Sequence, residues 1–378
     1  MFNLYEEETR AGSLHFTIVV AAVALFLSSL YGLCQLSPFN KINSKEWVMF
    51  SGWAGGGLIA RRLFVSVICR IPRLKRKVLV VVDCPSSNPN EWEPLKRIRG
   101  LEIVGVLGKE KDLWKVAKRV KAQEIVVMEP RLLKDKIFWE EVEGCGERGI
   151  LVRSWEEVCE EAFGYIPIRF AVHKGPFLIP PAPIYYEVGK RILDLTLAVL
   201  GLCLMAFLLP FIALAIYLTD RGPIFYKQTR VGKGGKPFTL YKFRTMKKGA
   251  EREGQPQWAT PGDPRVTPIG RFLRKSRLDE FPQFWNVLKG EMSIVGPRPE
   301  RPKFVADLKK EIPFYGLRHS VKPGITGWAQ VNYRYGSSKE DALRKLEYDL
   351  YYIKHRSLLL DLLVILRTIP VVLGFKGV

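Results

Sequence analysis

The feature that most constrains this chain is the apolar run Ile192–Leu218, which is long enough to cross a lipid bilayer. Cations stand at both of its ends, with Lys190 and Arg191 before it and Arg221 and Lys227 after it. Lysine and arginine beside membrane segments favour the cytoplasmic side. The charge pattern therefore assigns both ends of this one run to the cytoplasm, and it predicts Lys190 and Arg191 as anchors at the membrane surface.

Pro210 lies inside this run and suggests how both ends can share one side. A proline within a helix removes a backbone hydrogen bond and forces a bend. A helix that enters the membrane, kinks at Pro210 and returns to the same face agrees with the charges. The alternative is an ordinary span, which would place the soluble parts on opposite sides. We predict a re-entrant helix over 192–218.

A second apolar run, Leu14–Leu36, is also long enough to span a bilayer. A cleaved signal peptide is the alternative, but acidic residues precede the run, and it is longer than the apolar region of a signal peptide. Many cations follow, up to residue 77. Residues 1–77 therefore predict an N-terminal anchor, with a span at 14–36, its N-terminus outside, and a basic interfacial segment that includes the short apolar piece 47–60.

Residues 78–165 alternate between strand-like and helix-like stretches. The strand-like ones are KVLVVVD, LEIVGVLG, QEIVVM and ILVRSW, which predicts a small parallel sheet of Rossmann type. The first strand leads into Asp83–Ser87 and lacks the G-x-G-x-x-G turn that admits a pyrophosphate. We expect a degenerate Rossmann-like domain with a structural or regulatory role. The segment 166–189, rich in proline and aromatics, is predicted as a linker to a domain at 190–378.

The net charge of +21 implies an anionic partner: nucleic acid, phosphate ligands or a negative membrane face. The cations border apolar segments, and no homeodomain-like, zinc-finger or RNP pattern occurs. We expect an anionic lipid membrane and no nucleic acid. The six cysteines and four histidines are scattered, which argues against a zinc site or a disulfide framework and favours a reducing cytoplasm for most of the chain.

The first candidate for phosphate recognition is the segment 222–248, which predicts a β-hairpin with Gly232–Gly235 at its turn. In the strand that follows the turn, a period of two places Lys242 and Arg244 on one face. Two cations on one face suit a pyrophosphate. A solvated edge strand has the same pattern and remains the alternative.

The second candidate is the stretch Arg271–Glu300, where the adjacent carboxylates Asp279 and Glu280 follow several cations and precede a Pro-Arg-Pro corner at Arg298. Carboxylates among cations can hold a divalent metal beside a phosphate, and an ionised carboxylate can be a nucleophile. Ser276-x-x-Asp279 before an apolar run predicts a helix start, with the carboxylates near its positive end. An ordinary capped surface helix remains the alternative.

The turn-like segment KPGITGWAQ, at 322–330, exposes backbone N–H groups and the hydroxyl of Thr326. Thr326 and Gln330 are candidate substrate contacts, and a purely structural turn is the alternative. The last apolar segment carries Asp361 and Arg367, which favours an amphipathic helix on the membrane surface over a span.

Several blocks resemble, in order and at ordinary spacing, the bacterial polyprenyl-phosphate glycosyl-1-phosphate transferases. They are KRILD, GPIFYKQTRVGKGGKPF, YKFRTM, DPRVTPIGRFLRKSRLDEFPQFWNVLKGEMSIVGPRPE and KPGITGWAQ. The resemblance covers residue 190 to the C-terminus. The N-terminal half resembles the large, membrane-anchored members, which carry a degenerate nucleotide-binding-like domain and usually several N-terminal spans, where this chain offers one.

The resemblance implies a fold and a reaction. The fold is an α/β membrane protein in which the N-terminal helix and the Rossmann-like domain precede a monotopic α+β catalytic domain with a re-entrant helix and amphipathic surface helices. The reaction transfers a sugar-1-phosphate from a UDP-sugar to undecaprenyl phosphate and releases UMP. It is the first membrane step of exopolysaccharide, O-antigen or capsule synthesis, on the cytoplasmic face of the bacterial inner membrane, and it uses Mg²⁺.

In that family the aspartate of an Asp-Glu pair attacks the sugar-linked phosphate, and the lipid phosphate then attacks the covalent intermediate. Carried over, the resemblance makes Asp279 the nucleophile and Asp279 with Glu280 the Mg²⁺ ligands. Arg274 matches the family's phosphate-binding arginine. Lys242 and Arg298 are matched positions suited to hold the diphosphate or the leaving UMP.

Other functions stay open. A catalytically inactive membrane scaffold or regulator of polysaccharide assembly would keep this fold, although the presence of Arg274, Asp279, Glu280 and Arg298 argues against it. A membrane-tethered nucleic-acid-binding protein is suggested by charge alone. The sugar is also open: a hexose-1-phosphate is the first expectation, and an N-acetylated or deoxyamino sugar is the alternative. So is the oligomeric state, for which a homodimer is one alternative.

Overall fold

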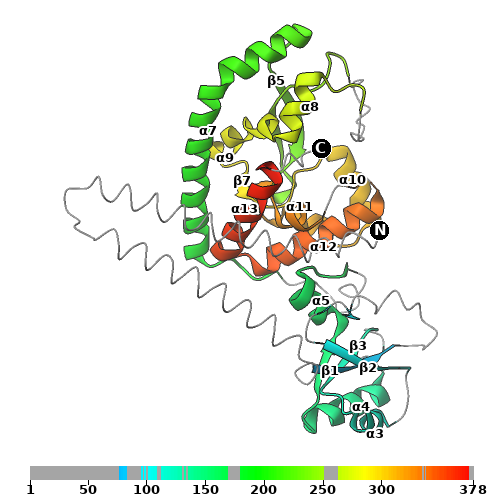
Figure 1. Ribbon diagram of the computed structural model, residues 1–378. Coiled ribbons are helices and arrows are strands. Elements are labelled where there is room, and N and C mark those ends of the chain that lie inside the picture. Colours follow the sequence, from blue (N-terminus) through cyan, green and yellow to red (C-terminus); the bar gives the residue numbers. More distant parts are fainter. Residues whose placement is uncertain are drawn as a thin grey trace, which may run out of the picture. The chain divides into compact units, whose positions relative to one another are not determined.

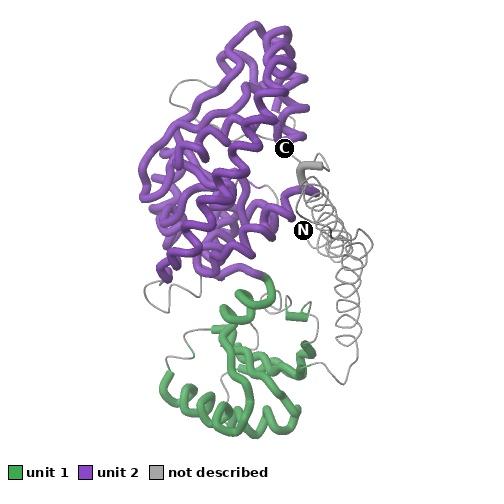
Figure 2. Tube along the Cα trace, turned by 90° about the vertical axis from the view of Figure 1, so that its left-hand side faces the viewer, with its two compact units in different colours: residues 1–163 green, residues 164–378 purple. Residues whose placement is uncertain are grey.

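The computed structural model describes residues 76–82, 95–96, 98, 101–108, 112–129, 132, 135–168, 179–250, 263–333, 336 and 338–373. The chain divides into two compact units, residues 1–163 and 164–378 (Figure 2). The predicted span at 14–36, the segment 47–60 and the stretch Asp83–Ser87 lie outside the described residues.

The first unit contains a four-stranded parallel sheet, which confirms the prediction from alternating strand-like and helix-like stretches (Figure 1). At their buried positions the two central strands are apolar except for Glu124, and leucine, valine and isoleucine from them pack against the helices. Such continuous apolar runs are typical of parallel strands with both faces covered. The strand order is β2-β1-β3-β4, and the elements are β1 (Arg76–Val81), β2 (Leu101–Leu107), α3 (Leu113–Val120), β3 (Glu124–Val127), α4 (Lys136–Glu147), β4 (Leu151–Ser154) and α5 (Trp155–Phe163).

The second unit begins with residues that the sequence assigned to a linker. Ile166 and Ile168 are buried in its core, where they meet Val305, Leu346 and Leu350. Apolar side chains at the start of this segment are removed from water by the helices that follow, and this burial anchors the segment. The predicted linker 166–189 is therefore packed into the core at Ile166 and Ile168, and its last residues, from Ile184 on, are helical.

Helix α7 (Ile184–Asp220) is 37 residues long and continues through Pro210. It bends along its length (Figure 1), as a proline inside a helix requires. Among the described residues, it is the one helix long and apolar enough to cross a membrane. The predicted range 192–218 was too short, because the helix begins directly after Pro183 and includes Lys190 and Arg191. Several of its large apolar side chains are exposed, including Phe207, Phe211, Leu214 and Leu218.

The predicted hairpin is confirmed. Strands β5 (Phe225–Val231) and β6 (Pro237–Phe243) pair antiparallel, and the short 3-10 helix η6 (Lys233–Gly235) joins them. Gly234 has a φ of 67°, a left-handed conformation that glycine adopts without strain. The turn therefore uses its glycines for backbone geometry.

The remainder of the second unit is mostly helical, and its described residues include one small parallel pair of strands, β7 and β8. Its elements, in chain order, are α8 (Pro268–Lys275), η7 (Leu278–Glu280), α9 (Gln283–Lys289), β7 (Ser293–Val295), α10 (Pro302–Glu311), η8 (Tyr315–Ser320), β8 (Gly324–Thr326), α11 (Trp328–Asn332), α12 (Lys339–His355) and α13 (Leu358–Leu373).

The sequence predicted Lys190 and Arg191 as anchors at the membrane surface. In the structure both side chains form hydrogen bonds within the protein. Arg191 donates to the carbonyl oxygens of Val287 and Leu288 at 2.9 and 3.0 Å, near the end of α9. The Lys190 ammonium lies 2.9 Å from a carboxylate oxygen of Asp361, which is fully buried. A buried carboxylate and the unpaired carbonyls at a helix end both attract cations.

Helix α13 is confirmed, but its charged residues face the protein. Asp361 binds Lys190, and Arg367 donates to Oδ1 of Asn332 at 2.7 Å. Its exposed side chains include Leu359 and Leu362 instead. Its most exposed side chains are therefore apolar, because Asp361 and Arg367 bond residues of other helices.

Candidate active site

The two adjacent carboxylates lie in η7, between helices α8 and α9. Asp279 and Glu280 are each only 6% exposed. Ser276 was predicted as the N-terminal cap of a helix, but it lies at the C-terminal end of α8 and its hydroxyl donates to the carbonyl of Phe272 at 2.9 Å. Arg277, at a φ of 60°, then reverses the chain. The carboxylates therefore occupy a tight 3-10 turn ahead of α9, and the local helix pattern did not predict it.

Glu280 is the more strongly held carboxylate of the pair. Its Oε1 accepts a hydrogen bond from Arg298 at 2.7 Å and one from Lys242 at 3.0 Å. Arg277 lies 3.6 Å from the same oxygen. Burial raises the pKa of Glu280, but Arg298, Lys242 and Arg277 outweigh that effect, so the pKa lies well below its usual range. Glu280 is therefore a fixed negative charge.

Asp279 has a different environment, although it is adjacent in sequence. Its Oδ2 lies 4.0 Å from the ammonium of Lys242. Burial raises the pKa of Asp279 and the charge of Glu280 raises it further, against the lowering effect of Lys242 and Arg274. The net shift is upward. An ionised Asp279 is thus less compensated than Glu280, which suits a nucleophile.

The cations around this pair come from separate parts of the chain. Lys242 lies on β6, Arg274 on α8 and Arg298 in the loop after β7. The Nε of Arg274 donates to Oγ1 of Thr245 at 2.9 Å, which fixes its position beside the turn. Burial lowers the pKa of Lys242, and Glu280 acts against it. The structure thus brings Lys242 and Arg298 onto the Glu280 carboxylate and places Arg274 within electrostatic reach of Asp279.

Arg244 is not brought to the carboxylate pair by a bond. Strand β6 ends at Phe243, and NH1 of Arg244 lies 3.5 Å from the carboxylate of Asp220 at the end of α7. Its two terminal nitrogens are buried, and neither has a hydrogen-bond partner among the described residues. The backbone N–H of Arg244 still donates to the carbonyl of Ile224 at 2.9 Å, so the two cations differ in their partners: Lys242 bonds Glu280, and Arg244 lies beside Asp220.

Thr326 and Gln330 have structural partners. The hydroxyl of Thr326 lies 2.7 Å from that of Thr368 on α13. The amide of Gln330 donates to the carbonyl of Ile325 at 3.2 Å. The carbonyl of Thr326 also accepts from the backbone N–H of Gly296 at 2.9 Å. This turn therefore supports the loop that carries Arg298, which agrees with the structural alternative left open by the sequence.

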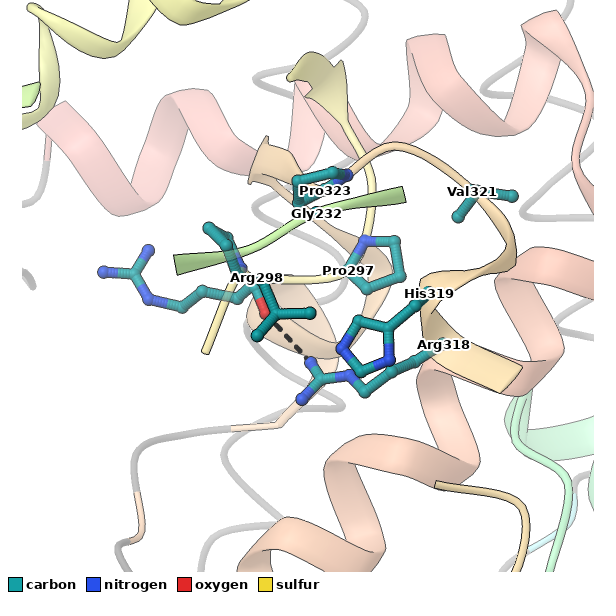
Figure 3. A pocket seen from close by; sticks show the side chains of 9 residues that line it. Gly232, Pro297, Arg298, Arg318, His319, Val321 and Pro323 are labelled. Carbon is teal, nitrogen blue, oxygen red and sulfur yellow. Dashed lines mark hydrogen bonds between the residues drawn. The ribbon is translucent and has the colours of Figure 1, made fainter. Parts of the chain in front are cut away.

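A small pocket lies beside this loop and includes two residues that sequence reasoning missed, Arg318 and His319 (Figure 3). Burial, together with the charges of Arg318 and Lys309, lowers the pKa of His319 to about 4, so the imidazole is neutral at neutral pH. The two residues stand directly before the turn 322–330, and that position was their only sequence signal. The pocket is lined by Val231, Gly232, Pro297, Arg298, Pro299, Arg318, His319, Val321 and Pro323.

The donor set around the turn fits one kind of metal. Among the described residues there is no group of three or more His, Cys, Asp or Glu side chains placed to hold a metal. Two carboxylates remain, Asp279 and Glu280. Mg²⁺ usually retains several waters and binds through one or two carboxylates plus substrate phosphates. The pair thus fits Mg²⁺ bound together with a phosphorylated substrate, and it does not fit a metal that requires a complete protein cage.

Comparison with known proteins places this site in a family. The family described as "Bacterial sugar transferase" matches residues 185–375, a range that contains every cation and carboxylate of the site.

Individual relatives agree with this match. The chain is 44% identical over 232 residues to a UDP-N-acetylgalactosamine-undecaprenyl-phosphate N-acetylgalactosaminephosphotransferase of Aeromonas hydrophila, covering 61% of this chain and 54% of that protein. It is 43% and 44% identical to UDP-glucose:undecaprenyl-phosphate glucose-1-phosphate transferases of Escherichia coli and Xanthomonas campestris. Those two matches cover 53% and 51% of this chain and 44% and 40% of the relatives. The chain thus spans about half the length of the curated relatives it matches. It belongs to the bacterial sugar transferase family.

Proposed function

We propose that this protein transfers a sugar-1-phosphate from a UDP-sugar to undecaprenyl phosphate and releases UMP. The carrying observation is the buried Asp279–Glu280 turn, in which Glu280 is bonded by Arg298 and Lys242 while Asp279 lies 4.0 Å from the ammonium of Lys242. Such an arrangement binds phosphate oxygens and offers one carboxylate for attack. Membership of the family and the names of the relatives support the substrate classes.

The first step is an attack by a carboxylate oxygen of Asp279 on the phosphorus attached to the sugar. A bond forms between that oxygen and the phosphorus, and the bond from the phosphorus to the bridging oxygen breaks. UMP leaves with the bridging oxygen and its electron pair, and the sugar phosphate stays on Asp279. Phosphoryl transfer depends mainly on positioning and charge neutralisation. Arg274, Lys242 and Arg298 supply both to the diphosphate.

The second step regenerates the enzyme. A phosphate oxygen of undecaprenyl phosphate attacks the same phosphorus, the bond to Asp279 breaks, and the free carboxylate returns. A covalent intermediate lets one site serve a soluble and a lipid substrate in turn. Mg²⁺, held by Asp279 and Glu280, would neutralise phosphate charge when bound. Glu280 is suited to this role because its charge is fixed.

We further propose that α7 is re-entrant and that the site lies at the cytoplasmic face of the bacterial inner membrane. Both ends of α7 are tied to the same unit. Near its start, Arg191 binds carbonyls of α9. At its end, Asp220 accepts from the backbone N–H of Lys248 at 2.9 Å. A helix that crossed the bilayer fully would carry its two ends to opposite sides. The bend of α7 and its exposed phenylalanines and leucines also agree with this form.

A direct assay tests the reaction. The purified full chain would be incubated with undecaprenyl phosphate, Mg²⁺ and a panel of UDP-sugars carrying hexoses, N-acetylated hexosamines and deoxyamino sugars. UMP release that needs one sugar and the lipid, that stops with EDTA and that returns with added Mg²⁺ would support the proposal and identify the donor.

Matched variants assign the roles. Asp279→Asn should stop UMP release and abolish the labelled protein that a radioactive UDP-sugar otherwise produces. Glu280→Gln should weaken both. Asp307→Asn, on the exposed side of α10, is the control and should retain activity. A folded wild type that releases no UMP with any donor would overturn the proposal and favour a non-catalytic scaffold.

A further inference from the structure

In the loop that carries Arg298, every backbone carbonyl from Pro297 to Glu300 accepts a hydrogen bond from elsewhere in the unit. Backbone N–H groups of Gly324 and Val231 donate to the carbonyls of Pro297 and Glu300 at 3.0 and 2.9 Å. The two carbonyls between them are bonded by arginine side chains. These are Arg318, which donates to Arg298 at 3.0 Å, and Arg230, which donates to Pro299 at 2.9 Å.

Arg318 is the more deeply buried of these two arginines and is itself fixed. It is 6% exposed, NH1 donates to the hydroxyl of Tyr315 at 2.7 Å, and NH2 lies 2.8 Å from the carboxylate of Asp349. Asp349 is on α12 and is 2% exposed. The guanidinium therefore connects a buried helix to one carbonyl of the loop. Figure 3 shows this bond, with the side chain of Arg298 extending to the other side of its own backbone.

The position of the Arg298 guanidinium depends on this loop. Its side chain is 31% exposed, and NH2 reaches Glu280 at 2.7 Å. A long arginine side chain loses about 2 kcal/mol of rotamer freedom when it is ordered. A loop with an unbonded carbonyl would let the guanidinium move toward water, and a displacement of about 1 Å in a catalytic site can cost about 100-fold in rate.

We propose that Arg318, held by Asp349 and Tyr315, is a positioning residue that fixes the loop so that Arg298 meets Glu280. The inference rests on the proposed function for its consequence in catalysis, but its geometric content does not. Arg318 acts through the backbone of Arg298 and contacts neither reacting phosphate. Lysine cannot replace it, because one ammonium does not supply the planar fork that reaches Tyr315, Asp349 and the loop carbonyl together.

A double-mutant cycle tests the catalytic consequence. Arg318→Lys should lower kcat/KM for UMP release by about 10- to 100-fold, as loss of a supporting contact does. In the Arg298→Ala background the same change should cost little or nothing, since the group it positions is gone. The control is Arg344→Lys, whose guanidinium instead pairs with Glu347 at 2.6 Å and lies over the ring of Tyr165. Equal losses in both backgrounds would show that Arg318, which also lines the pocket, acts independently of Arg298, and would overturn the proposal.

A chemical measurement tests the geometry without any turnover. Phenylglyoxal modifies exposed guanidinium groups, and mass spectrometry of the digested full chain reports the extent at Arg298. Arg318→Lys should raise labelling of Arg298 several-fold over wild type, and Arg344→Lys should not. Unchanged labelling in a folded Arg318→Lys protein would overturn the proposal even if the enzyme is active. Increased labelling in a protein that releases no UMP would support the positioning role while the proposed reaction fails.

A second variant covers the case in which Arg318→Lys does not fold. Tyr315→Phe removes only the hydroxyl that accepts from Arg318. It should give the same two signatures at smaller size: more labelling of Arg298, and a loss of kcat/KM that disappears in the Arg298→Ala background. A folded Tyr315→Phe protein with neither signature would count against the proposal.

Discussion

The ammonium of Lys242 lies 3.0 Å from Oε1 of Glu280 and reaches it from a strand 38 residues away in the sequence. The same ammonium is 4.0 Å from Asp279. One cation thus holds Glu280 ionised and also reduces the cost of ionising Asp279. The pKa values of the two neighbouring carboxylates shift in opposite directions, because Glu280 is bonded by Lys242 and Arg298 while Asp279 lies 4.0 Å from Lys242. Their roles can therefore be separated by mutation.

Lys242→Gln should move the acidic limb of the pH–rate profile to higher pH. Burial raises the pKa of Asp279, and Lys242 lowers it, so removing the ammonium raises it further. Activity requires the ionised form and is lost as the pH falls through this pKa. We also expect kcat/KM to fall about 100-fold at neutral pH, since charge stabilisation of this kind is worth several kcal/mol. Profiles of UMP release against pH would be compared with those of Lys289→Gln, an exposed control. A fall in rate without a shifted acidic limb would contradict the assignment of Asp279 as the titrating group.

His319 should make the folded protein less stable in acid. Its pKa is lowered from about 6.5 to about 4 by burial first, then by Arg318 and Lys309. The unfolded chain binds the proton more readily, so the contribution of neutral His319 is complete above pH 6.5 and is lost as the pH falls toward 4. Because His319 lines a pocket that solvent can enter, we expect a loss of about 2 kcal/mol rather than the full shift.

The measurement is the free energy of unfolding of wild type and His319→Gln between pH 4 and 8. The two curves should run parallel above neutrality and approach each other in acid, where the wild type loses the contribution. Parallel curves over the whole range would mean that the imidazole does not titrate differently in the folded protein.

Gly201→Ala should separate α7 from α9. A Cβ at this position would overlap the ring of Phe284, closer than two non-bonded carbons can approach. Overpacking of this kind costs about 1 to 3 kcal/mol. Gly146→Ala in α4 is the matched control, because nothing lies within 4 Å of its added Cβ, and alanine there should be neutral or slightly stabilising. Thermal unfolding in detergent would decide, and an unchanged midpoint for Gly201→Ala would show that α7 and α9 do not pack in this way.

Lys190→Met alone should destabilise the second unit more than Lys190→Met combined with Asp361→Asn. The single change leaves the buried Asp361 carboxylate without its ammonium partner, which we expect to cost roughly 3 kcal/mol. The double change removes both charges, and of the hydroxyls of Tyr186 and Tyr352, which now donate to different carboxylate oxygens, one can donate to the amide oxygen and the other can accept from the amide N–H. Partial recovery of the unfolding midpoint is the expected result. A double variant as unstable as the single one would show that the pair is not coupled.

Local sequence patterns determined a large part of this protein. Strand-like stretches that alternate with helix-like ones predicted the parallel sheet of the first unit, and the glycine-rich turn predicted the hairpin β5–β6. Two adjacent carboxylates after a group of cations pointed to Asp279 and Glu280. These features depend on periodicity and backbone conformation over a few residues, so they can be recognised without knowing what lies across the fold.

The tertiary structure decided which charges meet. Lys190 and Asp361 are 171 residues apart in sequence, yet the lysine binds this buried carboxylate. Arg244 follows the end of β6 and pairs with Asp220, while Lys242 joins Glu280. Arg318 became visible only through its bond to the loop of Arg298. Ion pairs depend on distance in space and on burial, and neither is written in the local pattern.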